Sequence, residues 1–352
     1  MKLSSPIVDL RSDACSLPTD AMRHAMAAAD CGNDDFYEDS TIQELEREAA
    51  ALLGKQQALF VQSGTMANMI AVMARVEPGQ CVLTSRRFHV FDYEEAAMRR
   101  VAQCDFRFVE DRTTGCQTEL LWDELAESEW SLVPLLSLEN SINRLGGTLL
   151  NCDQLQRGRE WATQRGMEIH LDGARLLNAA VALDVEPSQL AAFADSVSMV
   201  FTKALSAPAG AILAGDSELV SRARRFRWML GGGWKQGGAI AAACLVGLRT
   251  LRSRIPEDHV AARRLAEGLN SIHGLSVDVS RVATNIVFFG AVDPSIDLAR
   301  LTANLVEQGV RIGRFKADRR SRLVTHRNIC LSDIDWFLDR IRKAVQESQG
   351  QR

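Results

Sequence analysis

Two stretches decide the fold of this chain: His170-Leu171-Asp172-Gly173-Ala174-Arg175 and, about thirty residues later, Phe201-Thr202-Lys203-Ala204-Leu205. Each follows or lies within an apolar run typical of a β-strand. The first run leads into an acid and the second into a lone lysine. The order and spacing of these two side chains are more informative than either one alone.

An acid and a lysine in this arrangement are the pair that pyridoxal phosphate (PLP) requires. The lysine amine forms a Schiff base, and a carboxylate beneath the pyridinium nitrogen keeps the ring protonated. Taken alone, Asp172 is more often a turn or helix cap residue, and Lys203 is more often solvated. The order, spacing and flanking residues favour the cofactor interpretation.

Length and composition set the limits. A chain of 352 residues suits two domains, and its content of 46% hydrophobic and 24% charged residues is typical of a soluble enzyme. A net charge of −4 gives no excess of basic residues, so we do not expect the protein to bind nucleic acid. No apolar run reaches membrane-spanning length. Eight scattered cysteines without a CxxC pair indicate neither a metal site nor disulfides. Because the N-terminus also lacks a signal-like apolar core, we expect a cytoplasmic protein.

Strand-like and helical patterns alternate along the chain. Alternation of this kind favours a mainly parallel sheet covered on both faces, which is an α/β fold. We expect a large domain over residues 1–240 and a small α+β domain over residues 241–352. The strand-like runs of the large domain are 58–61, 81–83, 106–109, 132–138, 167–171, 197–201 and 211–213, and those of the small domain are 275–279, 285–289 and 322–325.

Two helix boundaries carry capping signals. Thr41 and Glu44 have the spacing of a capping box, which predicts a helix that runs through Leu53 and stops at Gly54. A final helix is predicted from Asp333, with Ser332 as its cap.

Three further motifs are candidates for binding. The run Gln62 to Asn68 joins a strand to a helix, and its Gly64 and Thr65 suit an anion such as the PLP phosphate. His89 follows a strand, where a flat imidazole can stack on a cofactor ring. Arg322 and Arg175 have the fork that matches a substrate carboxylate. Read singly, these motifs are more often a plain helix cap, an ordinary histidine and surface ion pairs.

Taken together and in order, the motifs resemble the L-threonine aldolase family, among the β-eliminating-lyase-like, fold-type I PLP enzymes. The resemblance covers most of the chain. Its further motifs are Leu10-Arg11-Ser12-Asp13, the loop from Gly32 to Thr41, Glu139-Asn140, Gly146-Gly147, Ala207-Pro208, Gly231-Gly232-Gly233 and Val324-Thr325-His326.

The resemblance implies a role for each matching residue. Lys203 would bind PLP covalently, Asp172 would pair with the ring nitrogen, and His89 would stack on the ring. The phosphate would bind to Gly64, Thr65 and Thr202, and Lys235 would reach the phosphate of a neighbouring subunit. The resemblance further implies that Ser12, Arg175 and Arg322 hold the substrate carboxylate, with Arg175 also near the cofactor.

The same resemblance implies an αβα large domain with a seven-stranded, mostly parallel sheet, a small α+β C-terminal domain and a homotetramer built as a dimer of dimers. The implied reaction is cleavage of a β-hydroxy-α-amino acid to glycine and an aldehyde, with low specificity. The base for the β-hydroxyl proton would be His89 or an ordered water, and we favour water. The alternatives are β-elimination on another amino acid and a PLP-binding homologue without turnover.

The chain departs from the family around the substrate side chain. Ile142 stands where the family carries a histidine, and isoleucine offers no hydrogen bond to a hydroxyl. In the loop Asp34 to Asp39, Phe36 takes the place of a tyrosine and Tyr37 replaces a small residue. We therefore expect Ile142 and Tyr37 to shape a pocket unlike that of the family. The sequence leaves open the physiological substrate and the preference between threonine epimers.

Overall fold

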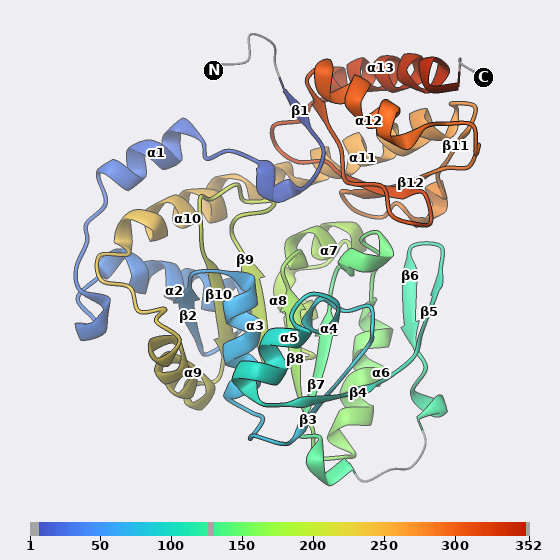
Figure 1. The fold of residues 1–352 in the computed structure, drawn as a ribbon. Coiled ribbons are helices and arrows are strands. Elements are labelled where there is room, and N and C mark those ends of the chain that lie inside the picture. Colours follow the sequence, from blue (N-terminus) through green and yellow to red (C-terminus); the bar gives the residue numbers. More distant parts are fainter. Residues whose placement is uncertain (1–6, 126–129, 350–352) are drawn as a thin grey trace.

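A seven-stranded sheet forms the centre of the large domain in the computed structural model, which describes residues 7–125 and 130–349 (Figure 1). The strands follow one another in space as β2 (Gln57–Val61), β10 (Ala211–Gly215), β9 (Ser196–Val200), β8 (Glu168–Gly173), β7 (Leu135–Glu139), β3 (Cys81–Thr84) and β4 (Asp105–Phe108). Neighbours from β9 to β4 are parallel, and only β10 is antiparallel to the strands beside it. All seven predicted strand runs are confirmed, and with them the mostly parallel sheet.

Helices cover both faces of this sheet. Successive strand residues point to opposite faces, and in β2 Phe60 packs in one hydrophobic cluster with Leu45 whereas Val61 packs in another with Ile70. The large domain is therefore an αβα unit. Its helices are α1 (Asp20–Ala27), α2 (Ser40–Leu53), α3 (Gly64–Met73), α4 (His89–Asp92), α5 (Glu95–Ala97), α6 (Cys152–Thr163), α7 (Leu176–Leu183), α8 (Pro187–Ala191), α9 (Ser217–Met229) and α10 (Gly238–Thr250).

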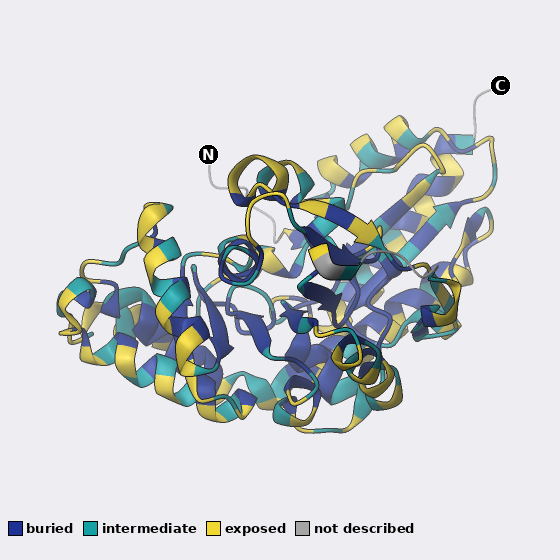
Figure 2. Cartoon of the chain, turned by 90° about the horizontal axis from the view of Figure 1, so that it is seen from below, coloured by how far each residue is buried: buried dark blue, intermediate teal, exposed yellow. Residues whose placement is uncertain are grey.

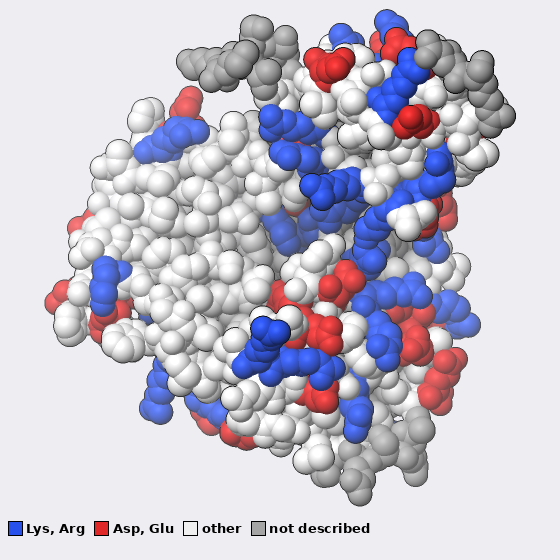
Figure 3. Space-filling model, in the orientation of Figure 1, with Lys and Arg blue, Asp and Glu red and all other residues white. Residues whose placement is uncertain are grey.

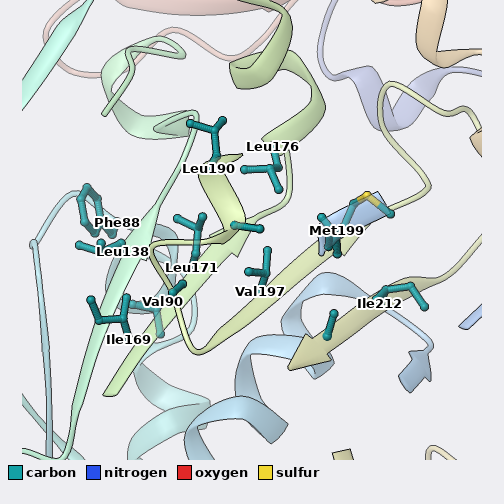
Figure 4. Packing of buried hydrophobic residues seen from close by; sticks show 14 of the residues in the cluster. Phe88, Val90, Leu138, Ile169, Leu171, Leu176, Leu190, Val197, Met199 and Ile212 are labelled. Carbon is teal, nitrogen blue, oxygen red and sulfur yellow. The ribbon is translucent and has the colours of Figure 1, made fainter. Parts of the chain in front are cut away.

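The central strands are buried along their whole length. Figure 4 shows Leu171 of β8 and Val197 of β9, which face each other in the sheet register, with Met199 and Ile212 further along the same cluster. Each of these four side chains is at most 1% exposed, and burial of such a side chain stabilises the fold by about 1.5–3 kcal/mol. The strands are the darkest elements in Figure 2, and Asp172 directly follows the buried Leu171.

A second hydrophobic cluster holds the small domain together. It joins the antiparallel strands β11 (Leu275–Ser276), β12 (Ile286–Ala291) and β14 (Arg320–Val324) to the helices α11 (Ile255–Asn270), α12 (Leu298–Glu307) and α13 (Leu331–Gln349). The N-terminal strand β1 (Val8–Asp9) pairs with β13 (Val310–Arg311), so that Val8 and Leu10 pack in this cluster. Helix α10 packs instead against α1 and α2 and contributes to the hydrophobic cluster of the large domain, and the boundary after residue 240 stays a prediction. A separate hairpin, β5 (Asp111–Thr114) and β6 (Gln117–Leu120), projects beside the large domain.

Two predicted helix caps are wrong. Helix α2 begins at Ser40 because Asp39 is the cap: its carboxylate accepts the Ile42 N–H at 3.0 Å and also the Gly238 N–H at 2.8 Å. Asp39 rather than Thr41 is the N-cap because its carboxylate also binds the start of the distant helix α10, a contact that the local spacing of Thr41 and Glu44 does not reveal. The predicted end of α2 at Gly54 is confirmed by a φ of 62°. Helix α13 begins at Leu331, so Ser332 lies inside its first turn.

None of the helices within the described residues is both long and apolar enough to cross a membrane. The same residues contain no group of three or more His, Cys, Asp or Glu side chains arranged to hold a metal ion.

Candidate active site

One cavity lies where the carboxyl ends of the parallel strands meet. Strands β7, β8 and β9 end at Glu139, Asp172–Gly173 and Val200, and ligands of open α/β sheets bind at this edge. The cavity has a volume of about 170 Å³. It brings together seven of the residues predicted from the sequence: Gly64, Thr65, His89, Asp172, Arg175, Thr202 and Lys203.

The N-terminus of α3 faces this cavity. Ser63 caps the helix by accepting the Met66 N–H at 3.2 Å, and the N–H groups of Gly64 and Thr65 come too early in the helix to have an acceptor within it. A Cβ atom added to Gly64 would lie 2.7 Å from Val200, so the close approach of helix and strand requires glycine here. The helix therefore offers free donors and its positive end to an anion.

Asp172 is a buried carboxylate, and each of its two oxygens accepts a hydrogen bond. Its oxygens accept hydrogen bonds from Asn68 Nδ2 at 2.8 Å and from the Ala174 N–H at 3.0 Å. Burial alone would raise the pKa of Asp172, but the charges of His89 and Lys203 together with these hydrogen bonds hold it below the usual value. Asp172 is thus an anion at neutral pH, ready to pair with a cationic ring nitrogen.

His89 is fixed by two carboxylates. Its Nδ1 lies 2.7 Å from Glu94 Oε1, and its backbone N–H donates to Glu139 Oε2 at 2.6 Å. Burial opposes protonation of the imidazole, but the hydrogen bond to Glu94 and the charge of Asp172 raise the pKa of His89 above its ordinary value. Tyr93 stacks on the imidazole, with ring centroids 4.7 Å apart. The ring orientation is therefore set before any ligand binds.

Lys203 has the electrostatics of a reactive amine. Removal from water is the largest cause that lowers its pKa, to about 8, and the charge of Arg175 lowers it further, against the opposing charges of Asp13 and Asp172. A lysine with this pKa is about one-tenth neutral at pH 7, far more than an ordinary lysine, and only the neutral amine is a nucleophile.

The two predicted arginines are held differently. Arg175 is buried and makes a bidentate ion pair with Asp13, at 2.7 and 2.8 Å. Arg322 donates from Nη1 to Asn143 Oδ1 at 2.5 Å, and Arg175 donates to the same oxygen at 3.3 Å. Asn143 therefore joins both guanidinium groups. Ser12 caps the short helical turn after it by accepting the Ala14 N–H at 3.2 Å.

Five predicted residues do not line this cavity within the single chain: Ser12, Arg322, Tyr37, Lys235 and Ile142. Arg322 is joined to the lining through Asn143. Tyr37 is 62% exposed on the surface, and Lys235 forms an exposed ion pair with Asp35. Ile142 is fully buried in the hydrophobic cluster of the sheet, and the cavity is lined by the next residue, Asn143. The substrate role of Ile142 and Tyr37 and the cofactor role of Lys235 stay predictions.

Sequence reasoning missed the residues that support the cavity. Asn68 links Asp172 to His170 and Ser198 by hydrogen bonds of 2.8–3.1 Å. Glu94 and Glu139 hold His89, as described above. Asn68 and Glu139 belong to motifs quoted from the sequence, and Glu94 lies five residues after His89. The sequence therefore contained these residues near the candidate site, but only the fold shows what each of them contacts.

Comparison with known proteins agrees with this geometry. The pattern of the β-eliminating lyase family matches residues 9–292. The low-specificity L-threonine aldolase 1 of Arabidopsis thaliana is 35% identical over 97% of each chain, and the low specificity L-threonine aldolase of Escherichia coli K12 is 33% identical over 80% of this chain and 84% of that protein. The solved threonine aldolase of Leishmania major has a TM-score of 0.79 at 18% identity and covers 96% of this chain and 99% of that one.

The sheet, its two helical layers and a lysine and an acid at one edge define a fold-type I architecture, as the sequence predicted. Since the family pattern spans most of the chain and a relative with 35% identity matches nearly its full length, the chain belongs to the β-eliminating lyase family.

Proposed function

We propose that this protein is a PLP-dependent aldolase that cleaves β-hydroxy-α-amino acids, such as L-threonine and L-allo-threonine, to glycine and an aldehyde with low specificity. The observation that carries the proposal is the meeting of Lys203, Asp172 and the free N-terminus of α3 in one cavity. The names of the relatives that are 33–35% identical support the reaction class.

The residues of the cavity fit PLP. The N–H groups of Gly64 and Thr65, with Thr202, would hold the phosphate. Asp172 would hold the protonated ring nitrogen, and Lys203 would provide the amine for covalent attachment. When bound, PLP supplies an electron sink for the carbanion left by cleavage of the Cα–Cβ bond.

The chain's own residues would orient the substrate and move its protons. Arg322, fixed by Asn143, would bind the α-carboxylate. Glu94 engages Nδ1 of His89, which leaves Nε2 for a substrate or a water. Because the raised pKa of His89 favours its protonated form, we propose that an ordered water takes the β-hydroxyl proton.

A substrate panel tests the proposal. Purified protein with PLP is incubated with L-threonine, L-allo-threonine, phenylserine and L-serine, and the products are identified. Glycine with the matching aldehyde is the expected result. Ammonia with the matching 2-oxo acid (pyruvate from L-serine, 2-oxobutyrate from the two threonines, phenylpyruvate from phenylserine) would establish the alternative, β-elimination. The absence of any product from all four would leave a homologue that binds PLP without turnover.

The attachment of PLP should depend on pH through Lys203. Because the pKa of Lys203 is lowered to about 8, its neutral fraction should rise about tenfold per pH unit below that value and level off above it. The rate of attachment to the PLP-free protein, followed by visible absorbance, should show this rise and plateau. A rate that still climbs tenfold between pH 9 and 10 would contradict a lowered pKa.

Asn143→Ala should raise KM about tenfold or more and change kcat much less. The variant removes the acceptor that fixes Arg322, and a hydrogen bond to a charged group contributes about 1.5–3 kcal/mol. Steady-state kinetics with L-threonine measures the effect. Asn304→Ala, which removes an exposed contact to Glu347 on the surface, is the control and should leave both constants unchanged. An unaltered KM for Asn143→Ala would remove Asn143 from substrate binding.

Assembly into a dimer of dimers remains part of the proposal. An exposed apolar patch supports it: Phe36, Tyr37, Trp228 and Met229 are 62–72% exposed, and patches of this kind mark interaction sites. Lys235 lies beside this patch, where a neighbour's phosphate would come within its reach. Sedimentation analysis should show a tetramer, and a fully active monomer would contradict the assembly.

We also propose the cytoplasm as the location. All eight cysteines are free, and free thiols suit a reducing compartment.

A further inference from the structure

A basic groove lies between the two domains, outside the cavity described above. Its volume is about 960 Å³, and its charged lining consists of six arginines against three aspartates. Figure 3 shows basic side chains gathered in the hollow where the small domain meets the large one. The arginines are Arg86, Arg87, Arg144, Arg281, Arg319 and Arg320.

Three links between neighbouring residues place the groove beside the cavity. Asn143 lines the cavity and the next residue, Arg144, lines the groove. Helix α4 contributes His89 to the cavity and Asp92, one turn later, to the groove. Arg320 lies two residues before Arg322 on β14, so both project from the same face of the strand, with Cα atoms about 7 Å apart.

Most of these arginines have guanidinium N–H groups that are available to bind an anion. Arg87, Arg144, Arg281 and Arg320 each face an aspartate at 3.3–3.7 Å, and none of these four ion pairs includes a hydrogen bond between the described side chains. Arg86 lies over the Phe108 ring at 3.7 Å and has no carboxylate partner among the described residues. Of the six, Arg319 differs because its guanidinium donates hydrogen bonds to three backbone carbonyls among the described residues.

The cavity itself is small. Its 170 Å³ lies below the roughly 300–1,000 Å³ of typical ligand sites, and the cofactor would fill much of it. A substrate with more than a short β-substituent must therefore extend beyond the cavity, and the groove is the adjoining space.

We propose that the groove binds an anionic group at the far end of the substrate's β-substituent, so that the preferred substrates are β-hydroxy-α-amino acids with a distal carboxylate or phosphate. The proposal rests on the function proposed above. Arg322 would hold the α-carboxylate, and the forks of Arg87, which follows β3 of the large domain, and Arg320, on β14 of the small domain, would bind the second anion.

The test compares phenylserine with 4-carboxyphenylserine, which differ only in the distal carboxylate. Calorimetry on the PLP-loaded protein gives Kd for phenylalanine and 4-carboxyphenylalanine, the analogues that lack the β-hydroxyl and so cannot undergo aldol cleavage, and product analysis gives kcat/KM for the two phenylserines. We expect 4-carboxyphenylalanine to bind about tenfold more tightly than phenylalanine, 4-carboxyphenylserine to have a kcat/KM about tenfold above that of phenylserine, and added salt to reduce both differences. The double variant Arg87→Gln with Arg320→Gln should remove the preference and leave phenylserine unchanged. Arg264→Gln, which alters an exposed arginine of α11 outside the groove, should keep it.

Equal Kd values for the two non-cleavable analogues in the natural protein would overturn the inference, as would a preference that survives the double variant. Because binding is measured apart from turnover, a failure of the groove proposal can be distinguished from a failure of the proposed aldolase function. Tighter binding of 4-carboxyphenylalanine without cleavage of either phenylserine would support the groove and contradict the aldolase function, whereas equal binding of the two analogues with cleavage of both phenylserines would do the reverse.

Discussion

Lys203→Ala is expected to abolish turnover and the visible absorbance of lysine-bound PLP. Among the described residues that line the cavity, Lys203 is the one lysine, and its lowered pKa of about 8 keeps part of its amine neutral near pH 7. Loss of the covalent attachment point together with a proton-transfer group should lower kcat by more than about 10³-fold. Absorbance spectra, borohydride trapping with mass spectrometry and the threonine assay measure the three consequences.

Two controls make this result specific. Lys203→Arg keeps a cation at the same place but removes the nucleophile, so it should be as inactive as the alanine variant. Lys343→Ala removes an exposed lysine of α13 and should behave like the natural protein. A borohydride-stable link between PLP and another lysine in Lys203→Ala would show that Lys203 is not the attachment point.

The sequence was sufficient for the large sheet because buried parallel strands are read as short apolar runs separated by helices. All seven runs became strands, and Gly54 ended its helix as predicted. Helix starts were less predictable. Asp39 caps α2 because it also binds the N–H of Gly238, almost two hundred residues away. A local pattern carries no information about such a contact.

The candidate site shows the same division. Residues that act through their own chemistry, such as Lys203 and Asp172, stood out because an amine and an acid follow strands. Residues that act through a neighbour did not: Asn143 holds Arg322, and Glu94 holds His89, only because the fold brings separate segments together. Arg175 was expected at the substrate, but Asp13 takes up two of its donors, a pairing across 162 residues.

Asp172→Asn should leave PLP bound and slow turnover by about 10²–10³-fold. The phosphate would still meet the N-terminus of α3, and Lys203 would still provide its amine, so the main attachment points remain. An amide, however, carries no charge to keep the ring nitrogen protonated. A preorganised electrostatic contact of this kind typically contributes 10²–10³-fold to kcat. Turnover of L-threonine and PLP content, measured on the same preparation, separate the two effects.

The surroundings of Asp172 make this effect large. Burial, which by itself raises the pKa of a carboxyl, is overcome here by the charges of His89 and Lys203 and by hydrogen bonds from Asn68 and Ala174, so the carboxylate stays ionised. Asn68→Ala removes one of these donors and should therefore reproduce part of the loss. Asp153→Asn, an exposed carboxylate in the first turn of α6, should have no effect. If Asp172→Asn turns over L-threonine at nearly the natural rate, the ring nitrogen does not depend on Asp172, and another group must stabilise the carbanion.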